Sequence, residues 1–193
     1  METIIYMVRH AESPFVFGEE KTRGLSEEGF ADAVRAADLL DDVQVDYMAS
    51  SSYTRAVQTI QSIADRKGIP IEEWEQLIER PIKGLNYKTT WEVLHEAIRE
   101  SFSDPDYALE GGESTRTAQQ RAVPVIEQLL SDHRGGTLVI GTHGNIMTII
   151  LNHYDKSYGY EFWMSTSKPD IYKLTFNEEN QLLDVQRVWQ VKE

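Results

Sequence analysis

The chain has 193 residues, no cysteine and a formal net charge of −13. The lack of cysteine excludes a disulfide framework, a thiolate zinc site and a cysteine nucleophile. The charge disfavours nucleic acid or an anionic membrane as a partner, and no segment has the length of a membrane-spanning helix, so we expect a cytoplasmic protein.

Strand-like and helix-like segments alternate through the first half of the chain. The strands predicted there are 4–8, 45–49 and one that starts at 69. A polar loop over 14–24 follows the first strand. Ser26 and Ser52 are predicted to cap the helices that follow the first and second strands, and Gly68 to end the second helix.

The second half continues the alternation. Helical spacing predicts helices around 91–102 and 122–130, and Pro124 is expected to kink the second of these or to delay its start. A strand at 137–141 precedes a helix of about ten residues from Gly144. The chain then shows two strand-like runs that predict a hairpin, 171–176 and 182–189.

This order predicts an α/β fold with three layers, αβα. The sheet is expected to be mostly parallel, with helices on both faces and the C-terminal hairpin at its edge. The length indicates a single domain over 1–193, with a small segment at about 80–112 that covers the substrate.

Two predicted strands each deliver a histidine to the loop that follows. His10 comes after the first strand with Arg9 beside it, and His143 comes after the strand at 137–141. Ligands of open α/β sheets bind beyond the carboxyl ends of the strands, so we expect one shared site. Arg9 and Arg55, the latter in the first turn of a helix, match an anionic ligand such as phosphate.

Each of these residues alone has a more ordinary interpretation. A lone arginine is most often part of a surface salt bridge, and a lone histidine at a strand end most often makes a structural hydrogen bond. Only the combination favours a site. We expect the remaining histidines to be surface or packing residues: His95, His133 and His153.

Phosphoryl transfer at such a site needs side chains with different chemical roles. A neutral imidazole can attack phosphorus if an acceptor holds its far nitrogen, and a second, protonated histidine can donate to the phosphoryl oxygens. A carboxylic acid can protonate the leaving oxygen and then activate water. Acidic residues are abundant here, so spacing alone does not select one.

Five segments together resemble the histidine phosphatase superfamily, in its phosphoglycerate mutase-like branch. They occur in the family's order within residues 4 to 151: Arg9–Ser13, Ser51–Thr59, Leu77–Arg80 followed by Gly84 and Leu85, Gly112–Ser114, and Thr142–Asn145. Any one of them is a weak signal, whereas five in order are a strong one.

The resemblance implies an enzyme, a metal-independent phosphomonoesterase that hydrolyses a small phosphorylated metabolite through a phosphohistidine. It implies no metal and no nucleotide cofactor. His10 would be the nucleophile and Glu79 the general acid and base. Other residues would hold the phosphoryl group or add contacts to it: Arg9, Arg55, His143, Gly144 and Asn145.

The chain also departs from the family pattern. Ala11 stands where the family usually has glycine, and its methyl group is expected to disturb the hydrogen bond that orients His10. The stretch between Glu79 and Gly112 is shorter than the insertion of the mutases, which favours a phosphatase.

Four aromatic residues are candidates for an apolar specificity wall, but core packing is their more common role: Phe15, Phe17, Tyr87 and Trp91. Lys83 and Lys88 are expected to be solvated surface residues.

Three alternatives stay open at this point. One is a mutase of the same fold that moves phosphate within a phosphoglycerate. Another is a non-catalytic module that binds a phospho-ligand or a protein, for which Ala11 is the only hint. The last is a metallohydrolase, although the zincin-like start at His95–Glu96 has Arg99 where the second histidine belongs.

Overall fold

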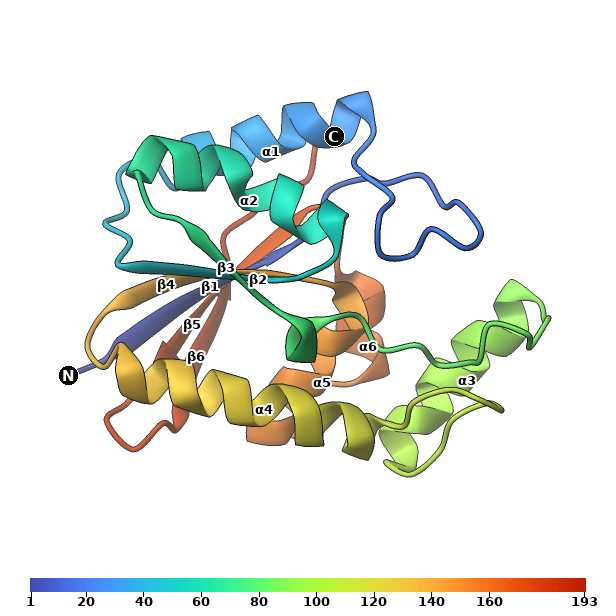
Figure 1. The fold of residues 1–193 in the computed structure, drawn as a ribbon. Helices are drawn as coiled ribbons and strands as arrows, with labels where there is room; N and C mark the ends of the chain where they lie inside the picture. The colour runs from blue at the N-terminus through green and yellow to red at the C-terminus, as the bar shows by residue number, and fades with distance from the viewer.

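Six strands form one sheet in the computed structural model, which describes residues 1–193 (Figure 1). Their order across the sheet is β3–β2–β4–β1–β5–β6. Four neighbouring strands are parallel: β1 (Thr3–Arg9), β2 (Tyr47–Ser51), β3 (Ile71–Trp74) and β4 (Thr137–Thr142). The hairpin of β5 (Asp170–Phe176) and β6 (Leu182–Arg187) adds two antiparallel strands at one edge. The predicted fold class is confirmed.

Helices cover both faces of this sheet (Figure 1). α1 (Glu27–Leu39) and α2 (Thr54–Lys67) pack on one face, and α4 (Thr115–Asp132) and α5 (Gly144–Tyr154) pack on the other. The short helices are η1 (Glu75–Leu77) and α6 (Tyr160–Ser165), and α3 (Trp91–Ser103) lies beside α6. None of the helices combines the length and hydropathy that a bilayer crossing requires.

Local signals account for most helix ends. Ser26 caps α1, since its side chain accepts a hydrogen bond from the backbone N–H of Gly29, and Gly68 ends α2 with a φ of 66°. The prediction that Ser52 caps α2 is wrong. Its hydroxyl donates instead to Glu75 Oε1 at 2.7 Å, and α2 begins at Thr54 without a side-chain cap.

Pro124 lies within α4, which runs unbroken from Thr115 to Asp132. The prediction of a delayed start is therefore wrong. Ser114 caps the helix by accepting a hydrogen bond from Thr117 N, and the buried apolar face packs into the larger core cluster. Tertiary packing of this kind outweighs the single backbone bond that a proline removes.

The strand order explains where a site can form. β1 and β4 are adjacent and parallel, with Arg9 paired to Thr142, and His10 N donates to Thr142 O at 3.0 Å. The chain leaves β1 toward the face with α1 and leaves β4 toward the face with α5 (Figure 1). Neighbouring strands whose connections part in this way leave a crevice at their carboxyl ends.

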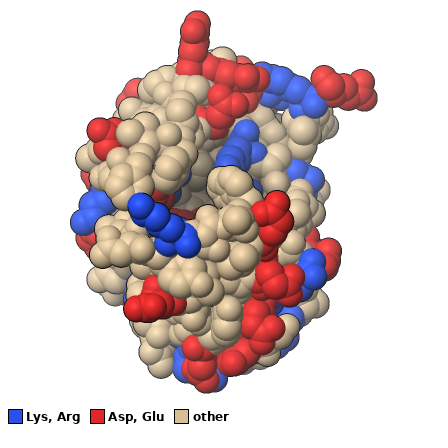
Figure 2. All heavy atoms as spheres, turned by 90° about the vertical axis from the view of Figure 1, so that its right-hand side faces the viewer, with Lys and Arg blue, Asp and Glu red and all other residues tan.

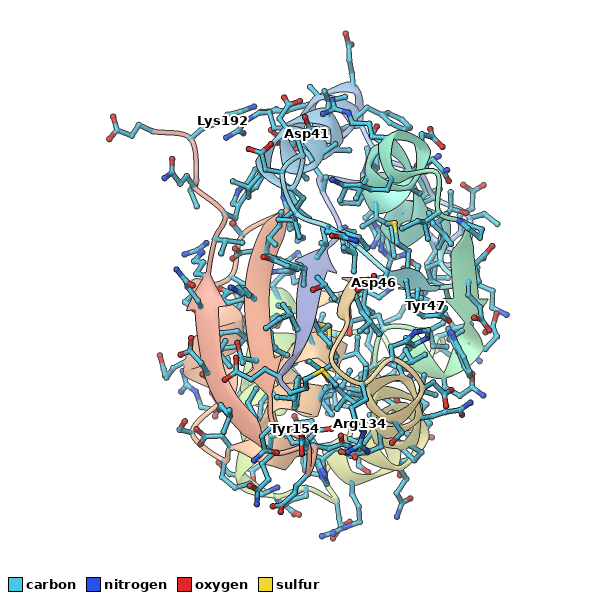
Figure 3. All side chains as sticks on the ribbon, turned by 90° about the vertical axis from the view of Figure 1, so that its left-hand side faces the viewer. Asp41, Asp46, Tyr47, Arg134, Tyr154 and Lys192 are labelled. Carbon is cyan, nitrogen blue, oxygen red and sulfur yellow. The ribbon has the colours of Figure 1, made fainter.

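The opposite end of the sheet is closed by its own contacts. Asp46 ties the start of β2 to the start of β4, because its carboxylate accepts a hydrogen bond from Thr137 N at 2.8 Å (Figure 3). Asp46 N in turn donates to Thr137 O, also at 2.8 Å. This pairing aligns the strands whose far ends carry the candidate site.

Candidate active site

His10 is held as a neutral imidazole with one nitrogen available. Its Nδ1 lies 2.7 Å from the carbonyl oxygen of Ala11, so Nδ1 carries the proton and donates it. Burial and then the charge of Arg55 lower the pKa of His10 well below its usual value. Nε2 therefore keeps its lone pair, which is the state a nucleophile needs.

Ala11 does not disturb this hydrogen bond. Its side chain is fully buried and packs with Leu25 and Ala33. Its backbone N–H donates to Thr59 Oγ1 at 3.0 Å, and the Thr59 hydroxyl donates to Arg55 O at 2.7 Å. The threonine of the Ser51–Thr59 segment thus fixes the backbone that orients His10.

His143 lies directly opposite, at the N-cap of α5. The ring centroids of His10 and His143 are 5.2 Å apart, and His143 is fully buried. Ser51, at the end of β2, places its Oγ 2.7 Å from Nε2 of His143, whereas Nδ1 has no partner in the protein. Burial, together with the positive charges of Arg55 and Arg9, lowers the pKa of His143 well below its usual value.

Gly144 makes room for Arg9. A Cβ at Gly144 would lie 2.6 Å from Cζ of Arg9, so only glycine lets the guanidinium pack against the start of α5. Nη1 of Arg9 donates to the Thr166 hydroxyl, and its buried Nε has no partner. The guanidinium of Arg9 thereby reaches from the end of β1 to the residue that starts α5.

Arg55 is the most enclosed cation of the site. It is 1% exposed, and its guanidinium donates to Glu20 O and Glu20 Oε1, both at 2.6 Å. Glu20 belongs to the loop between β1 and α1, and 42% of its side chain is exposed. A surface carboxylate thus covers the outer side of a buried arginine, which the sequence pattern did not reveal.

Glu79 lies against the N-terminus of α5. Its Oε1 accepts from Arg80 N at 2.9 Å and Ile146 N at 2.8 Å, and its Oε2 accepts from Asn145 N at 3.1 Å. These bonds fix the position of the carboxylate. Each carboxylate oxygen offers about two lone-pair sites, so Oε2 keeps one site free for a further donor.

Arg80 holds the side chain of Asn145, next to the Glu79 carboxylate. It is buried, and its Nη2 donates to Ser101 Oγ and Asn145 Oδ1, both at 2.9 Å. Burial lowers its pKa to about 10. The side chain of Asn145 is therefore held by Arg80, and Asn145 meets the site through its backbone N–H to Glu79.

Lys168 and Arg23 also belong to this region, and sequence reasoning missed both. The charge of Lys168 acts on His10, and burial together with the charges of Arg9 and Arg23 lowers the pKa of Lys168. A signal for Lys168 was present, because it lies two residues before the start of β5. An antiparallel neighbour of β1 begins where β1 ends, as the pairing of Arg9 with Asp170 shows.

Several buried nitrogen atoms around the two histidines have no hydrogen-bond partner within the protein. They are Arg9 Nε, Arg55 Nε and His143 Nδ1. A buried polar atom without a hydrogen bond costs about 1–3 kcal/mol, so each such atom calls for an explanation. Three such atoms belong to residues that surround the imidazole of His10. An anion with several oxygen atoms could form hydrogen bonds with all three.

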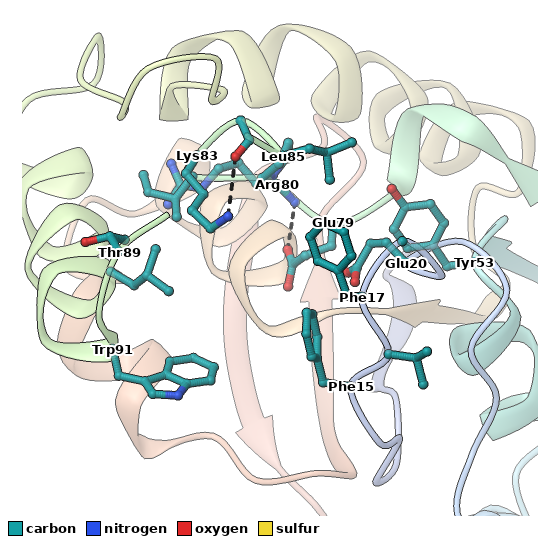
Figure 4. A pocket seen from close by; sticks show the side chains of 16 residues that line it. Phe15, Phe17, Glu20, Tyr53, Glu79, Arg80, Lys83, Leu85, Thr89 and Trp91 are labelled. Carbon is teal, nitrogen blue, oxygen red and sulfur yellow. Dashed lines mark hydrogen bonds between the residues drawn. The ribbon is translucent and has the colours of Figure 1, made fainter. Parts of the chain in front are cut away.

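A cavity of about 360 Å³ opens beside Glu79. Figure 2 shows a hollow on this face of the molecule. Lysine or arginine side chains lie at its rim, and most of the residues around it are uncharged. The expectation that Phe15, Phe17 and Trp91 are core residues is wrong, because they are exposed and line this cavity (Figure 4). Tyr87 lines a separate, smaller hollow, and Lys83 lines the main one.

The sequence profile of the histidine phosphatase superfamily (branch 1) matches residues 5–187. The chain belongs to the histidine phosphatase superfamily. This confirms the resemblance drawn from the five segments, including its phosphoglycerate mutase-like branch, and it confirms that the protein is an enzyme of this kind.

Named relatives of this histidine phosphatase have different activities. It is 29% identical to a 2,3-bisphosphoglycerate-dependent phosphoglycerate mutase of Mesorhizobium japonicum, over 90% of this chain and 93% of that protein. It is 28% identical to a putative phosphoserine phosphatase 2 of Hydrogenobacter thermophilus, over 76% of each chain.

Solved structures share the fold of this histidine phosphatase. A mycobacterial glucosyl-3-phosphoglycerate phosphatase in complex with VO3 superposes with a TM-score of 0.77 at 20% identity, over 98% of this chain and 99% of that one. The phosphoserine phosphatase of Entamoeba histolytica gives 0.76 at 18% identity, over 95% and 96% of the two chains.

Proposed function

We propose that this protein is a metal-independent phosphomonoesterase that hydrolyses small phosphorylated compounds through a phosphohistidine at His10. The observation that carries the proposal is a neutral, oriented imidazole surrounded by buried donors that lack partners. Arg9, Arg55 and His143 hold the phosphoryl oxygens. A negatively charged group there raises the proton affinity of His143, so His143 can donate from Nδ1.

The proposed reaction has two steps. Nε2 of His10 attacks phosphorus, the bond from phosphorus to the ester oxygen breaks, and Glu79 gives its proton to the leaving oxygen. Water then attacks the phosphohistidine, Glu79 takes a proton from that water, and the bond from phosphorus to nitrogen breaks to release phosphate. Oε2 of Glu79, with its free lone-pair site, is the oxygen we assign to these transfers.

Cations of the chain supply the charge that this reaction needs. Arg9, Arg55 and Lys168 all act electrostatically on His10. Preorganised donors of this kind stabilise charge as it develops, without a metal ion. Phosphoryl transfer within a phosphoglycerate is the second candidate function, because one relative at 29% identity carries the mutase name.

Phosphate release measured with and without EDTA tests the metal-free proposal. We expect the purified protein to hydrolyse a simple phosphomonoester at the same rate in about 1 mM EDTA, because arginines provide the positive charge. Loss of activity in EDTA, restored by a divalent cation, would overturn it. In a parallel assay on 3-phosphoglycerate with a bisphosphoglycerate primer, isomerisation faster than phosphate release would establish the mutase instead.

Glu20 competes with a bound anion for Arg55 in this proposal. Because Glu20 occupies both terminal nitrogens of Arg55, Glu20→Gln is expected to bind inorganic phosphate about tenfold more tightly, as one charge-assisted hydrogen bond is weakened. Calorimetric titration measures this change. Glu19→Gln is the matched control, since it removes the same charge from a neighbour that has no ion pair. Equal affinities in the two variants would contradict the competition.

A further inference from the structure

The cavity beside Glu79 has a wall made mostly of large apolar side chains. Phe15, Phe17, Leu85 and Trp91 are 73–75% exposed and come from two distant parts of the chain, 15–17 and 85–91, yet all of them line this one cavity. Figure 4 shows Phe15, Phe17 and Trp91 around the opening, with Glu79 at its inner end. Such a gathering of exposed aromatic groups is typical of a ligand site, because leaving them in water forgoes the free energy of burial.

The charged groups that line the cavity balance one another, since two are acidic and two are basic. Glu20 and Glu79 both face the cavity. Of its cations, Arg80 is buried and donates to Ser101 and Asn145, and Lys83 donates to Gly84 O at 3.3 Å. Lys83 keeps its positive charge, but most of the cations lie around the histidines, where the phosphoryl group is expected.

We propose that this cavity binds the uncharged, apolar part of the substrate, so that the preferred substrates are phosphate monoesters of aryl or medium-chain alkyl alcohols. This inference rests on the proposed phosphatase function at the same site, because Glu79 and Glu20 line the cavity and Glu20 binds Arg55 of the phosphoryl site. A substrate whose alcohol carries a carboxylate, such as 3-phosphoglycerate or phosphoserine, would place that charge against the apolar wall. The volume of about 360 Å³ lies within the range of small-molecule sites, about 300–1,000 Å³.

A series of linear monoalkyl phosphates from ethyl to octyl tests the inference. We expect kcat/KM to rise about three- to fourfold for each added methylene until the cavity is filled, the gain typical of burying one methylene. Hexyl phosphate should exceed both 3-phosphoglycerate and phosphoserine by at least about tenfold, since it has no second charge and fills the apolar wall.

Two variants connect this preference to the wall. In Trp91→Ala and Phe17→Ala the ratio of kcat/KM for hexyl phosphate to that for ethyl phosphate should fall about tenfold, mainly through KM, because part of the wall is lost. Both side chains are exposed, so neither truncation leaves a hole in the core. Leu183→Ala is the control, since Leu183 is exposed on β6 and lines a different hollow.

The outcomes separate this inference from the proposed function. Hydrolysis with no dependence on chain length, or a ratio unchanged in both variants, overturns the inference and leaves the phosphatase intact. No hydrolysis of any ester in the series, with no phosphorylated His10, overturns the proposed function. A dimer in solution that Trp91→Ala converts to monomers assigns the apolar wall to an interface between copies, which also overturns the inference.

Discussion

Replacing His10 by alanine is expected to abolish the covalent phosphoenzyme and to lower kcat by at least about 10³-fold. The reason is that His10 is the imidazole whose Nδ1 is held by a backbone carbonyl, whereas His143 binds Ser51 through Nε2. Removing a nucleophile from such a set removes most of the rate enhancement by itself.

The measurement is rapid quenching with a ³²P-labelled substrate. Phosphohistidine is labile to acid and stable to alkali, so the wild-type protein should give a label with that behaviour on His10, and His10→Ala should give none. A label on another residue, or an acid-stable one, would contradict the mechanism. His153→Ala is the matched control, because it removes an exposed imidazole from α5 and should keep both label and activity.

His10→Ala should remain folded. The imidazole makes one hydrogen bond, to the Ala11 carbonyl, and Arg9 and Arg55 keep their own partners without it. Binding of inorganic phosphate, which depends on those arginines, therefore serves as the readout of an intact site. A variant that binds phosphate and forms no adduct has lost its nucleophile only.

Replacing Glu79 by glutamine is expected to lower kcat/KM much more for substrates with poor leaving groups than for substrates with good ones. A general acid contributes about 10²- to 10⁴-fold where the leaving alkoxide needs a proton, so kcat/KM for alkyl phosphates should fall within that range. For p-nitrophenyl phosphate it should fall less than about tenfold, because that leaving group needs little protonation. kcat/KM is the informative quantity, since it reports the phosphorylation step.

The second step gives an independent signature in the same variant. Glutamine cannot take the proton from water, so dephosphorylation slows and p-nitrophenol should appear in a burst followed by a slow steady state. Equal losses of kcat/KM on alkyl and aryl substrates, with no burst, would remove Glu79 from the role of acid and base.

Glu79→Gln is also expected to remove a hydrogen bond from the start of α5. The assay with the aryl substrate shows whether the site survives this structural change. The carboxylate accepts from Asn145 N and Ile146 N at the start of α5, and an amide nitrogen cannot accept either bond. One unpaired donor there should lower the free energy of unfolding by about 1–3 kcal/mol. A retained kcat/KM for p-nitrophenyl phosphate shows that this loss of stability leaves the site assembled.

The sequence by itself determined the layers of the fold and indicated the residues of the proposed phosphoryl site. Alternating apolar strands and amphipathic helices allow few arrangements, and histidines at the ends of β1 and β4 must meet if those strands are neighbours. His10, Arg9, Arg55 and His143 were therefore predictable, as each belongs to a local segment with its own signature.

Only the tertiary structure decided what surrounds them. Glu20 on Arg55, Ser51 on His143 and Lys168 near His10 are contacts between segments far apart in the chain, and no local periodicity encodes such a distance. The aromatic residues show the same limit. Phe17 and Trp91 are residue types that are often buried, but the loop after β1 and the start of α3 extend past the end of the sheet, beyond the two large core clusters on its faces.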